Sequence, residues 1–144
     1  MSHSAIPSAL RAEATAYSRH CCCYCLSQED VLGMSFTVDH IIPKSLGGET
    51  TTENLCLACW DCNLLKQSRI MGTDERTGEE APLFHPRRQK WDDHFRWERG
   101  GLLIVGLTPT GRATIMALRL NRPLLLRGRE RWIAAGWHPP QITW

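Results

Sequence analysis

Residues 38–43 read Val-Asp-His-Ile-Ile-Pro, and one Cys-x-x-Cys pair lies on each side of them. The first pair is Cys22 with Cys25, and the second is Cys59 with Cys62. Four thiolates at this spacing suit a tetrahedral Zn²⁺, because each pair can bend around the ion and donate two sulfurs from one tight turn. The sequence therefore predicts a structural zinc site that brackets a segment with chemistry of its own.

The first pair belongs to a run of cysteines, Cys-Cys-Cys-Tyr-Cys at residues 21–25, in which only Cys22 has the two-residue spacing to Cys25. Disulfides or a redox-active pair are the alternatives. An odd count of seven cysteines, and an N-terminal segment without the apolar core of a secretory signal, disfavour disulfides. The other three cysteines are predicted to pack as small hydrophobic side chains; they are Cys21, Cys23 and Cys56.

Hydrophobic periodicity and turn residues predict an α+β fold. Between and beside the cysteine pairs, we expect a strand at residues 35–42, a loop, a short second strand at 54–57, and a helix from 60 to about 70. A helix is also predicted at residues 7–18, before the first pair. This order brings the end of the first strand close to the start of the helix.

The second half is predicted to contain a loop up to Trp91, a β-hairpin and two helices. The hairpin strands are expected at residues 94–98 and 102–107. Helix signals follow, with an N-cap and a proline opening each helix and a glycine ending the last; they are Thr108 with Pro109, Asn121 with Pro123, and Gly136.

Four polar residues are expected to converge on one cavity. Asp39 and His40 end the first strand, Asn54 starts the second, and Asn63 lies in the first turns of the helix. Asp39 and Asn63 offer oxygen ligands to a hard cation such as Mg²⁺, which keeps several waters and accepts few protein ligands. His40, neutral at pH 7, can accept a proton from water, and Asn54 either orients that imidazole or braces the loop.

These residues resemble the HNH endonucleases of the ββα-metal class, in the subgroup with a Cys-x-x-Cys on each side. The resemblance covers residues 20–70 and rests on Asp-His-Ile-Ile-Pro-Lys-Ser-x-Gly-Gly from Asp39, on Asn-Leu at 54–55, and on Cys-x-x-Cys-Asn-x-x-Lys from Cys59. It implies a ββα-metal core with a structural four-cysteine zinc site, followed by the hairpin and helices. We expect one domain over residues 1–144, with a core at 20–71 and an extension at 82–140.

The resemblance also implies a function. His40 matches the general base, Asp39 and Asn63 match the ligands of a catalytic Mg²⁺ or Mn²⁺, and Asn54 matches the middle motif residue. Asn63 stands where the family has either His or Asn, and Asn favours Mg²⁺ or Mn²⁺ over softer ions. The expected reaction is one-metal hydrolysis of DNA phosphodiester bonds, leaving 5′-phosphate and 3′-hydroxyl ends. Lys66 and Arg69 are expected to reach substrate phosphates.

Charge fits a polyanionic partner. Residues 1–80 carry 6 basic and 11 acidic side chains, whereas residues 81–144 carry 11 basic and 4 acidic ones, and 14 of the 17 basic residues are Arg. Charge alone also fits a solvated helix face. We expect double-stranded DNA as partner, with RNA as an alternative, in a cytoplasmic monomer or weak homodimer. No apolar run reaches membrane-spanning length. A zinc-stabilised nucleic-acid-binding module without catalysis, and a purely structural adaptor, are the competing functions.

Overall fold

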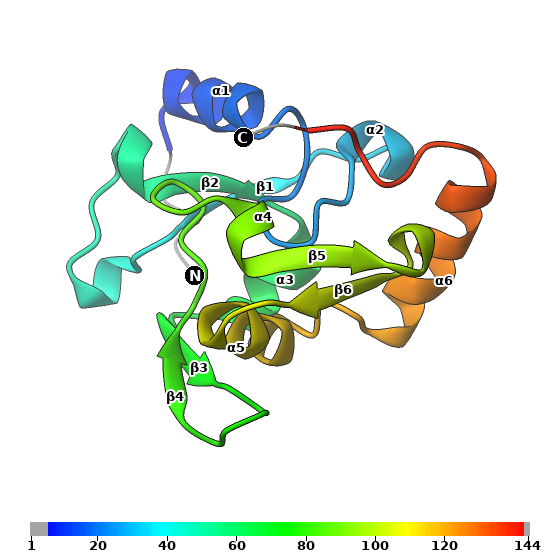
Figure 1. Ribbon diagram of the computed structural model, residues 1–144. Coiled ribbons are helices and arrows are strands. Elements are labelled where there is room, and N and C mark those ends of the chain that lie inside the picture. Colours follow the sequence, from blue (N-terminus) through cyan, green and yellow to red (C-terminus); the bar gives the residue numbers. More distant parts are fainter. Residues whose placement is uncertain (1–5, 143–144) are drawn as a thin grey trace. The chain divides into compact units, whose positions relative to one another are not determined.

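The computed structural model describes residues 6–142 (Figure 1). These residues divide into two compact units. The first unit comprises the chain up to residue 70 together with His85–Arg88, and the second comprises Met71–Phe84 and the residues from Gln89 onward. Helices and short antiparallel strands occur in both units, which confirms the α+β fold class. The expectation of one nuclease domain over the whole chain stays a prediction.

The first unit contains the predicted strand-loop-strand-helix order. β1 (Thr37–His40) pairs antiparallel with β2 (Leu55–Ala58), and α3 (Trp60–Lys66) follows one residue later. α1 (Ser8–Tyr17) packs against β2, which buries all four of its residues. A short helix, α2 (Glu29–Leu32), was not predicted; it is a single turn and too short to show helical periodicity.

Residues 85–88 belong to the first unit because Arg87 joins its elements. The Arg87 guanidinium donates to the carbonyl of Leu55 at 2.9 Å, pairs with Glu13 of α1, and lies 3.8 Å from the ring centroid of Tyr17. One basic residue of the second half of the sequence therefore has a structural partner rather than a solvent-exposed charge.

The strand register places the motif residues. Asp39 lies opposite Cys56, and His40 lies opposite Leu55. The pairing continues beyond the strands, since the Ile41 N–H donates to the Asn54 carbonyl at 2.9 Å. The start of the second strand is therefore held beside the end of the first.

The loop between β1 and β2 is compact and contains two 3₁₀ turns, Lys44–Leu46 and Thr52–Asn54. Gly47 ends the first turn with φ +89°, a left-handed conformation that glycine adopts without steric cost. Gly48 has no space for a side chain, because a Cβ there would lie 1.7 Å from the Ile42 carbonyl oxygen. The Gly-Gly pair of the motif thus allows the loop to fold back on itself.

α3 ends at Lys66, about one turn earlier than the predicted end near residue 70. Gln67 adopts φ +56°, which stops the helical path. The Arg69 side chain then donates to the carbonyls of Leu65, at 2.6 Å, and Lys66, at 3.3 Å. Local caps of this kind end the helix although the hydrophobic pattern continues.

The second unit contains two hairpins and three helices within the described residues. The predicted hairpin and the last two helices are confirmed, whereas the hairpin β3/β4 and the one-turn helix α4 lie where a loop was expected. The elements are β3 (Met71–Thr73), β4 (Glu80–Pro82), α4 (Trp91–His94), β5 (Phe95–Glu98), β6 (Leu103–Gly106), α5 (Pro109–Leu118) and α6 (Pro123–Ala134).

The helix signals were confirmed at α5 and only in part at α6. The Thr108 hydroxyl accepts a hydrogen bond from the Gly111 N–H at 3.0 Å, as an N-cap does. Pro123 opens α6, but the N-cap is Arg122, and the predicted Asn121 has another role. Its amide pairs with the N–H and the carbonyl of Ile104, at 2.9 and 2.8 Å, so the Asn121 side chain connects β6 to the start of α6.

Aromatic rings form the core of the second unit. Trp91 and Phe95 are buried with ring centroids 5.1 Å apart, and Phe84 meets Phe95 edge-on at 5.3 Å. Beside them Arg112 pairs with buried Asp74 at 2.9 Å, and this guanidinium lowers the pKa of Asp74 to about 2. The ion pair joins the β3/β4 hairpin to α5. Because its two partners are far apart in the sequence, local sequence patterns do not predict this contact.

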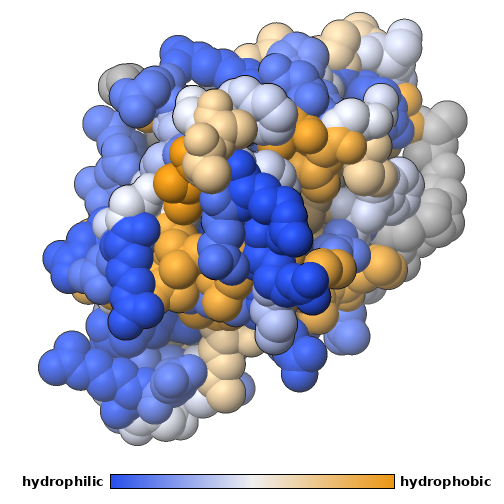
Figure 2. Space-filling model, turned by 90° about the vertical axis from the view of Figure 1, so that its right-hand side faces the viewer, coloured by the Kyte–Doolittle hydropathy of each residue, from blue (hydrophilic) through white to orange (hydrophobic). Residues whose placement is uncertain are grey.

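Surface residues are mixed in character. Figure 2 shows hydrophobic side chains reaching the surface between strongly hydrophilic ones. Arg129 is fully buried and donates to the Leu120 carbonyl, so it is not part of a basic surface. Basic side chains of the second half that are exposed to solvent remain numerous; they are Arg88, Lys90, Arg96, Arg99, Arg119, Arg127 and Arg131.

Candidate metal centre and active site

Four cysteine sulfurs lie together in the first unit. The Sγ atoms of Cys22, Cys25, Cys59 and Cys62 are all within 4.8 Å of one another, and all four residues are buried. A tetrahedral zinc with sulfur ligands at about 2.3 Å has neighbouring sulfurs about 3.8 Å apart. The Cys25 and Cys59 sulfurs are 3.8 Å apart. This donor set therefore fits a zinc ion, and the spacing argument selected the same four residues.

The backbone around the cysteines is folded to serve such an ion. Cys59 is the N-cap of α3, and its Sγ accepts a hydrogen bond from the Cys62 N–H at 3.4 Å. On the other side Leu26 turns with φ +59° and donates its N–H to the Cys22 carbonyl at 2.9 Å. The other three cysteines are buried outside the cluster, and burial raises the pKa of the Cys21 thiol to about 12.

A cavity of about 480 Å³ opens within the first unit. Three of the four predicted polar residues, Asp39, His40 and Asn63, line it. They come from the end of β1 and from α3, as the sequence suggested. Further polar residues complete the wall; they are Lys44, Ser45, Gln67 and Ser68.

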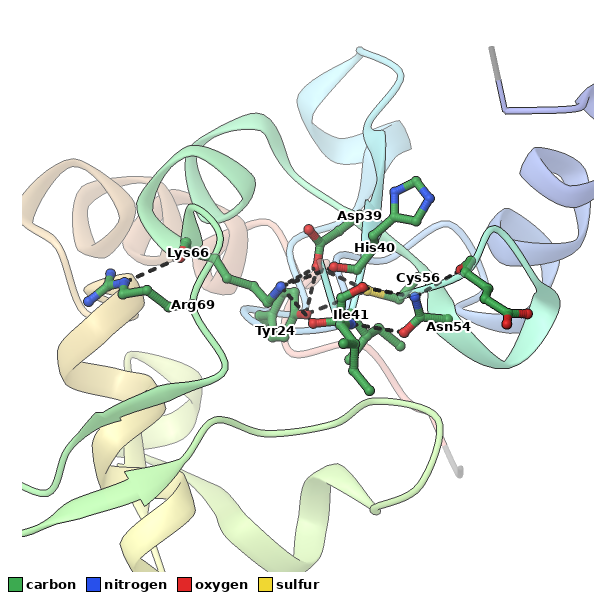
Figure 3. A network of polar contacts seen from close by, with 10 residues as sticks. Tyr24, Asp39, His40, Ile41, Asn54, Cys56, Lys66 and Arg69 are labelled. Atoms are coloured by element: carbon green, nitrogen blue, oxygen red, sulfur yellow. Dashed lines mark hydrogen bonds and ion pairs between the residues drawn. The ribbon is translucent and has the colours of Figure 1, made fainter. Parts of the chain in front are cut away.

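Asp39 is buried, and its contacts are concentrated on one carboxylate oxygen (Figure 3). The Tyr24 hydroxyl donates to Oδ2 at 3.0 Å, and the Lys66 ammonium lies 3.0 Å from the same atom. Burial raises the pKa of Asp39, while the Lys66 charge and the hydrogen bonds from Lys66 and Tyr24 oppose that rise. The ion pair keeps a carboxylate in a place where an isolated charge would be costly.

His40 is mostly buried, and its imidazole is held by a threonine. Nε2 lies 2.9 Å from the Thr50 hydroxyl oxygen, and within the described residues Nδ1 has no hydrogen-bond partner. Burial lowers the pKa of His40, and the nearby Lys44 charge lowers it further. The neutral imidazole required of a base is thus favoured at neutral pH.

Asn54 does not contact the imidazole. Its Oδ1 accepts from the Ile42 N–H at 2.8 Å, and its Nδ2 donates to the carbonyls of Ile42 and Glu49, both at 2.9 Å. The side chain is buried and fully used in bracing the loop, and it does not line the cavity. Of the two roles considered for Asn54, the geometry selects the brace.

Lys66 and Arg69 do not lie where a phosphate-binding role was expected. Lys66 is 1 % exposed, and besides Asp39 its ammonium contacts the carbonyls of His40, at 3.2 Å, and Ile41, at 3.0 Å. The Lys66 ammonium is thus enclosed by protein oxygens, and its expected contact with a substrate phosphate stays a prediction. Arg69 is exposed but caps α3, and it is not among the residues lining the cavity.

Three residues at the site were missed by the sequence reasoning. Tyr24 was treated only as a spacer between cysteines, although an aromatic hydroxyl there faces the strand that carries Asp39. Thr50 is one of three adjacent threonines, and no local signal distinguishes the one that contacts His40. Lys44 follows Pro43 in the motif and could have been found, because it lies only four positions after His40 in the sequence.

Comparison with known proteins agrees with this geometry. The family model of HNH endonucleases matches residues 22–69, which is the segment holding both cysteine pairs and the cavity. Searches of curated proteins and of solved structures gave no match. No helix among residues 6–142 is long and apolar enough to cross a membrane. The family match, the four clustered sulfurs and the order β1, β2, α3 coincide in residues 22–69, and this segment is similar to the domain of HNH endonucleases.

Proposed function

We propose that this protein is a metal-dependent endonuclease that hydrolyses phosphodiester bonds of DNA. One observation carries the proposal: a single cavity is lined by a carboxylate, an imidazole and an amide, from Asp39, His40 and Asn63. These are the residue types that a hydrolytic site on a phosphodiester needs, namely oxygen ligands for a cation and a base for water.

The donor set supports Mg²⁺ or Mn²⁺ as the catalytic cation. Asp39 offers a carboxylate oxygen and Asn63 an amide oxygen, and hard divalent cations accept such ligands together with several waters. A bound cation would supply positive charge that stabilises the phosphorus-centred transition state and the departing 3′ oxygen. The cysteine cluster lies apart from this chemistry, and we propose zinc as its ion.

His40 is the proposed general base. In the tautomer in which Nε2–H donates to the Thr50 hydroxyl, the lone pair of Nδ1 is available to take a proton from water. That water attacks phosphorus in line with the leaving oxygen, which yields 5′-phosphate and 3′-hydroxyl ends. Asn54 supports the reaction indirectly, because it fixes the loop between His40 and Thr50.

Lys44 replaces Lys66 as the proposed phosphate contact. It is exposed, it lines the cavity, and its charge acts on His40. Lys44→Gln should raise KM for DNA several-fold. The slope of log binding constant against log salt concentration should become shallower by about the amount that one phosphate contact contributes. The matched control is Lys90→Gln, at an exposed lysine of the second unit.

The decisive experiment uses zinc-replete protein and supercoiled plasmid, with and without Mg²⁺ or Mn²⁺. We expect cation-dependent nicking that falls by a factor of roughly 10²–10⁴ in His40→Ala. His20→Ala is the matched control, because His20 is exposed and bonds only to Glu29. Cleavage by His40→Ala at the wild-type rate would refute the proposed base.

The competing function, a nucleic-acid-binding module without catalysis, predicts a different result in the same assay. Such a module would retard DNA in a gel and cleave neither DNA nor RNA with any divalent cation. Single- and double-stranded DNA and RNA, tested side by side, identify the substrate. Preferential cleavage of RNA would support the proposed hydrolytic site and would replace DNA with RNA as the substrate.

A further inference from the structure

The Asp39 carboxylate is held from one side only. The Tyr24 hydroxyl and the Lys66 ammonium both contact Oδ2, each at 3.0 Å, and the Cys56 thiol lies 4.0 Å from the same oxygen. Within the described residues, no hydrogen bond reaches Oδ1. In Figure 3 the contacts of Asp39 converge on one oxygen, and the other points away from them.

The residues that hold Oδ2 are themselves firmly fixed. Tyr24 is fully buried and stands between the clustered cysteines Cys22 and Cys25. Lys66 is buried at the end of α3, one turn after Cys62 of the same cluster. Burial of both side chains restricts their movement.

We propose that Tyr24 and Lys66 are positioning residues that occupy Oδ2, so that Asp39 presents only Oδ1 to a divalent cation. This inference rests on the proposed nuclease function. A carboxylate can take a cation through one oxygen or through both. Presentation of one oxygen leaves more of the octahedral shell of Mg²⁺ or Mn²⁺ for water and for substrate phosphate.

Substitution of Lys66 tests this role, because a positioning residue and a residue that serves only general stability predict opposite changes in Mn²⁺ affinity. Lys66→Met deletes a positive charge beside the carboxylate and frees Oδ2. We therefore expect Mn²⁺ to bind on the order of 10-fold tighter. Turnover at saturating Mn²⁺ should fall on the order of 10-fold or more, because the cation is no longer confined to one oxygen.

Two measurements are needed on the zinc-loaded protein at pH 8. Mn²⁺ affinity is measured without substrate, from the electron paramagnetic resonance signal of free Mn²⁺. Plasmid nicking at saturating Mn²⁺ gives turnover. Weaker Mn²⁺ binding, or unchanged turnover, in folded Lys66→Met would overturn the proposal.

Tyr24→Phe provides a second test that leaves the charge unchanged. It removes one hydrogen bond to Oδ2 and should lower turnover at saturating Mn²⁺ by about 3- to 10-fold, without weakening Mn²⁺ binding. Tyr17→Phe is the matched control at the other tyrosine of the chain, which lies on α1 and should change neither quantity. Equal behaviour of the two tyrosine variants would contradict the role of Tyr24. If Lys66→Met does not fold, this pair decides the question.

Asp39→Ala separates failure of this inference from failure of the proposed function. If Asp39→Ala binds Mn²⁺ as tightly as wild type does, Asp39 is not part of a cation site, and the proposed function fails as well. If Asp39→Ala abolishes Mn²⁺ binding but Lys66→Met and Tyr24→Phe behave as wild type, only the positioning role is overturned.

Discussion

Asn54 and Thr50 are expected to fail in opposite ways when they are substituted. Asn54 makes three hydrogen bonds to the loop backbone and none to the imidazole, whereas Thr50 contacts His40 Nε2. Asn54→Ala should therefore lower stability and leave the chemistry of folded protein largely intact. Thr50→Val should lower turnover and leave stability largely intact.

The magnitudes follow from the contacts. Each intramolecular hydrogen bond contributes about 1 kcal/mol net, so the three bonds of Asn54 amount to about 3 kcal/mol of unfolding free energy. For a chain of this size, that loss lowers Tm by about 10 °C. Loss of the one hydrogen bond that orients His40 should raise the activation free energy by about 1–1.5 kcal/mol, which lowers kcat close to 10-fold.

Thermal unfolding and plasmid nicking on the same preparations measure both effects. Nicking is assayed well below the Tm of Asn54→Ala, so that the variant is folded during the assay. Thr51→Val is the matched control, because the neighbouring Thr51 makes no side-chain cap to the 3₁₀ turn that it precedes. It should resemble wild type in both assays.

The reverse pattern would contradict both of these roles. Asn54→Ala with wild-type Tm and a loss of nicking as large as that of His40→Ala would make Asn54 a participant in the reaction. Thr50→Val with wild-type kcat would show that the imidazole needs no partner at Nε2.

Three further predictions concern the architecture around the site. Cys62→Ser, or removal of the ion with a chelator, should unfold the first unit, seen as loss of helical circular dichroism together with loss of about one zinc per chain, because structural zinc contributes folding free energy directly. Gly48→Ala should destabilise the first unit by several kcal/mol in denaturant unfolding, since a Cβ would lie 1.7 Å from the Ile42 carbonyl oxygen; a wild-type midpoint would contradict that packing. Because Arg112 lowers the pKa of Asp74 to about 2, the stability that this ion pair contributes is complete above about pH 4 and is lost as pH falls towards 2. Acid unfolding of Asp74→Asn should lack this component, and identical acid curves for variant and wild type would contradict it.

Features that depend on neighbouring residues were predictable from the sequence. The Cys-x-x-Cys pairs, the Thr108-Pro109 start of α5, and the Gly136 that ends α6 with φ +83° each act within a few residues. The positions of Asp39 and Asn63 on one cavity followed from the order of the elements. These inferences need no knowledge of how distant segments meet.

Features that depend on distant partners were missed. Helical spacing placed Lys66 at a surface, and its burial arises from Asp39, 27 positions earlier in the sequence. The β3/β4 hairpin was taken as a loop because its stability comes from contacts such as Asp74 with Arg112, 38 positions apart. The choice between the two roles of Asn54 could not be made until the path of the loop was known.

The short helix α3 connects the stability of the domain to its chemistry. It has seven residues and contains a clustered cysteine, Cys62, a cavity residue, Asn63, and the ion-pair partner of Asp39, Lys66. An isolated helix of this length is not stable in water. Its first turn is fixed instead by Cys59 and Cys62, which belong to the proposed zinc site. Because the same helix sets the position of Asn63 and pairs with Asp39, an ion bound by the cysteines would order both proposed ligands of the catalytic cation without taking part in the reaction.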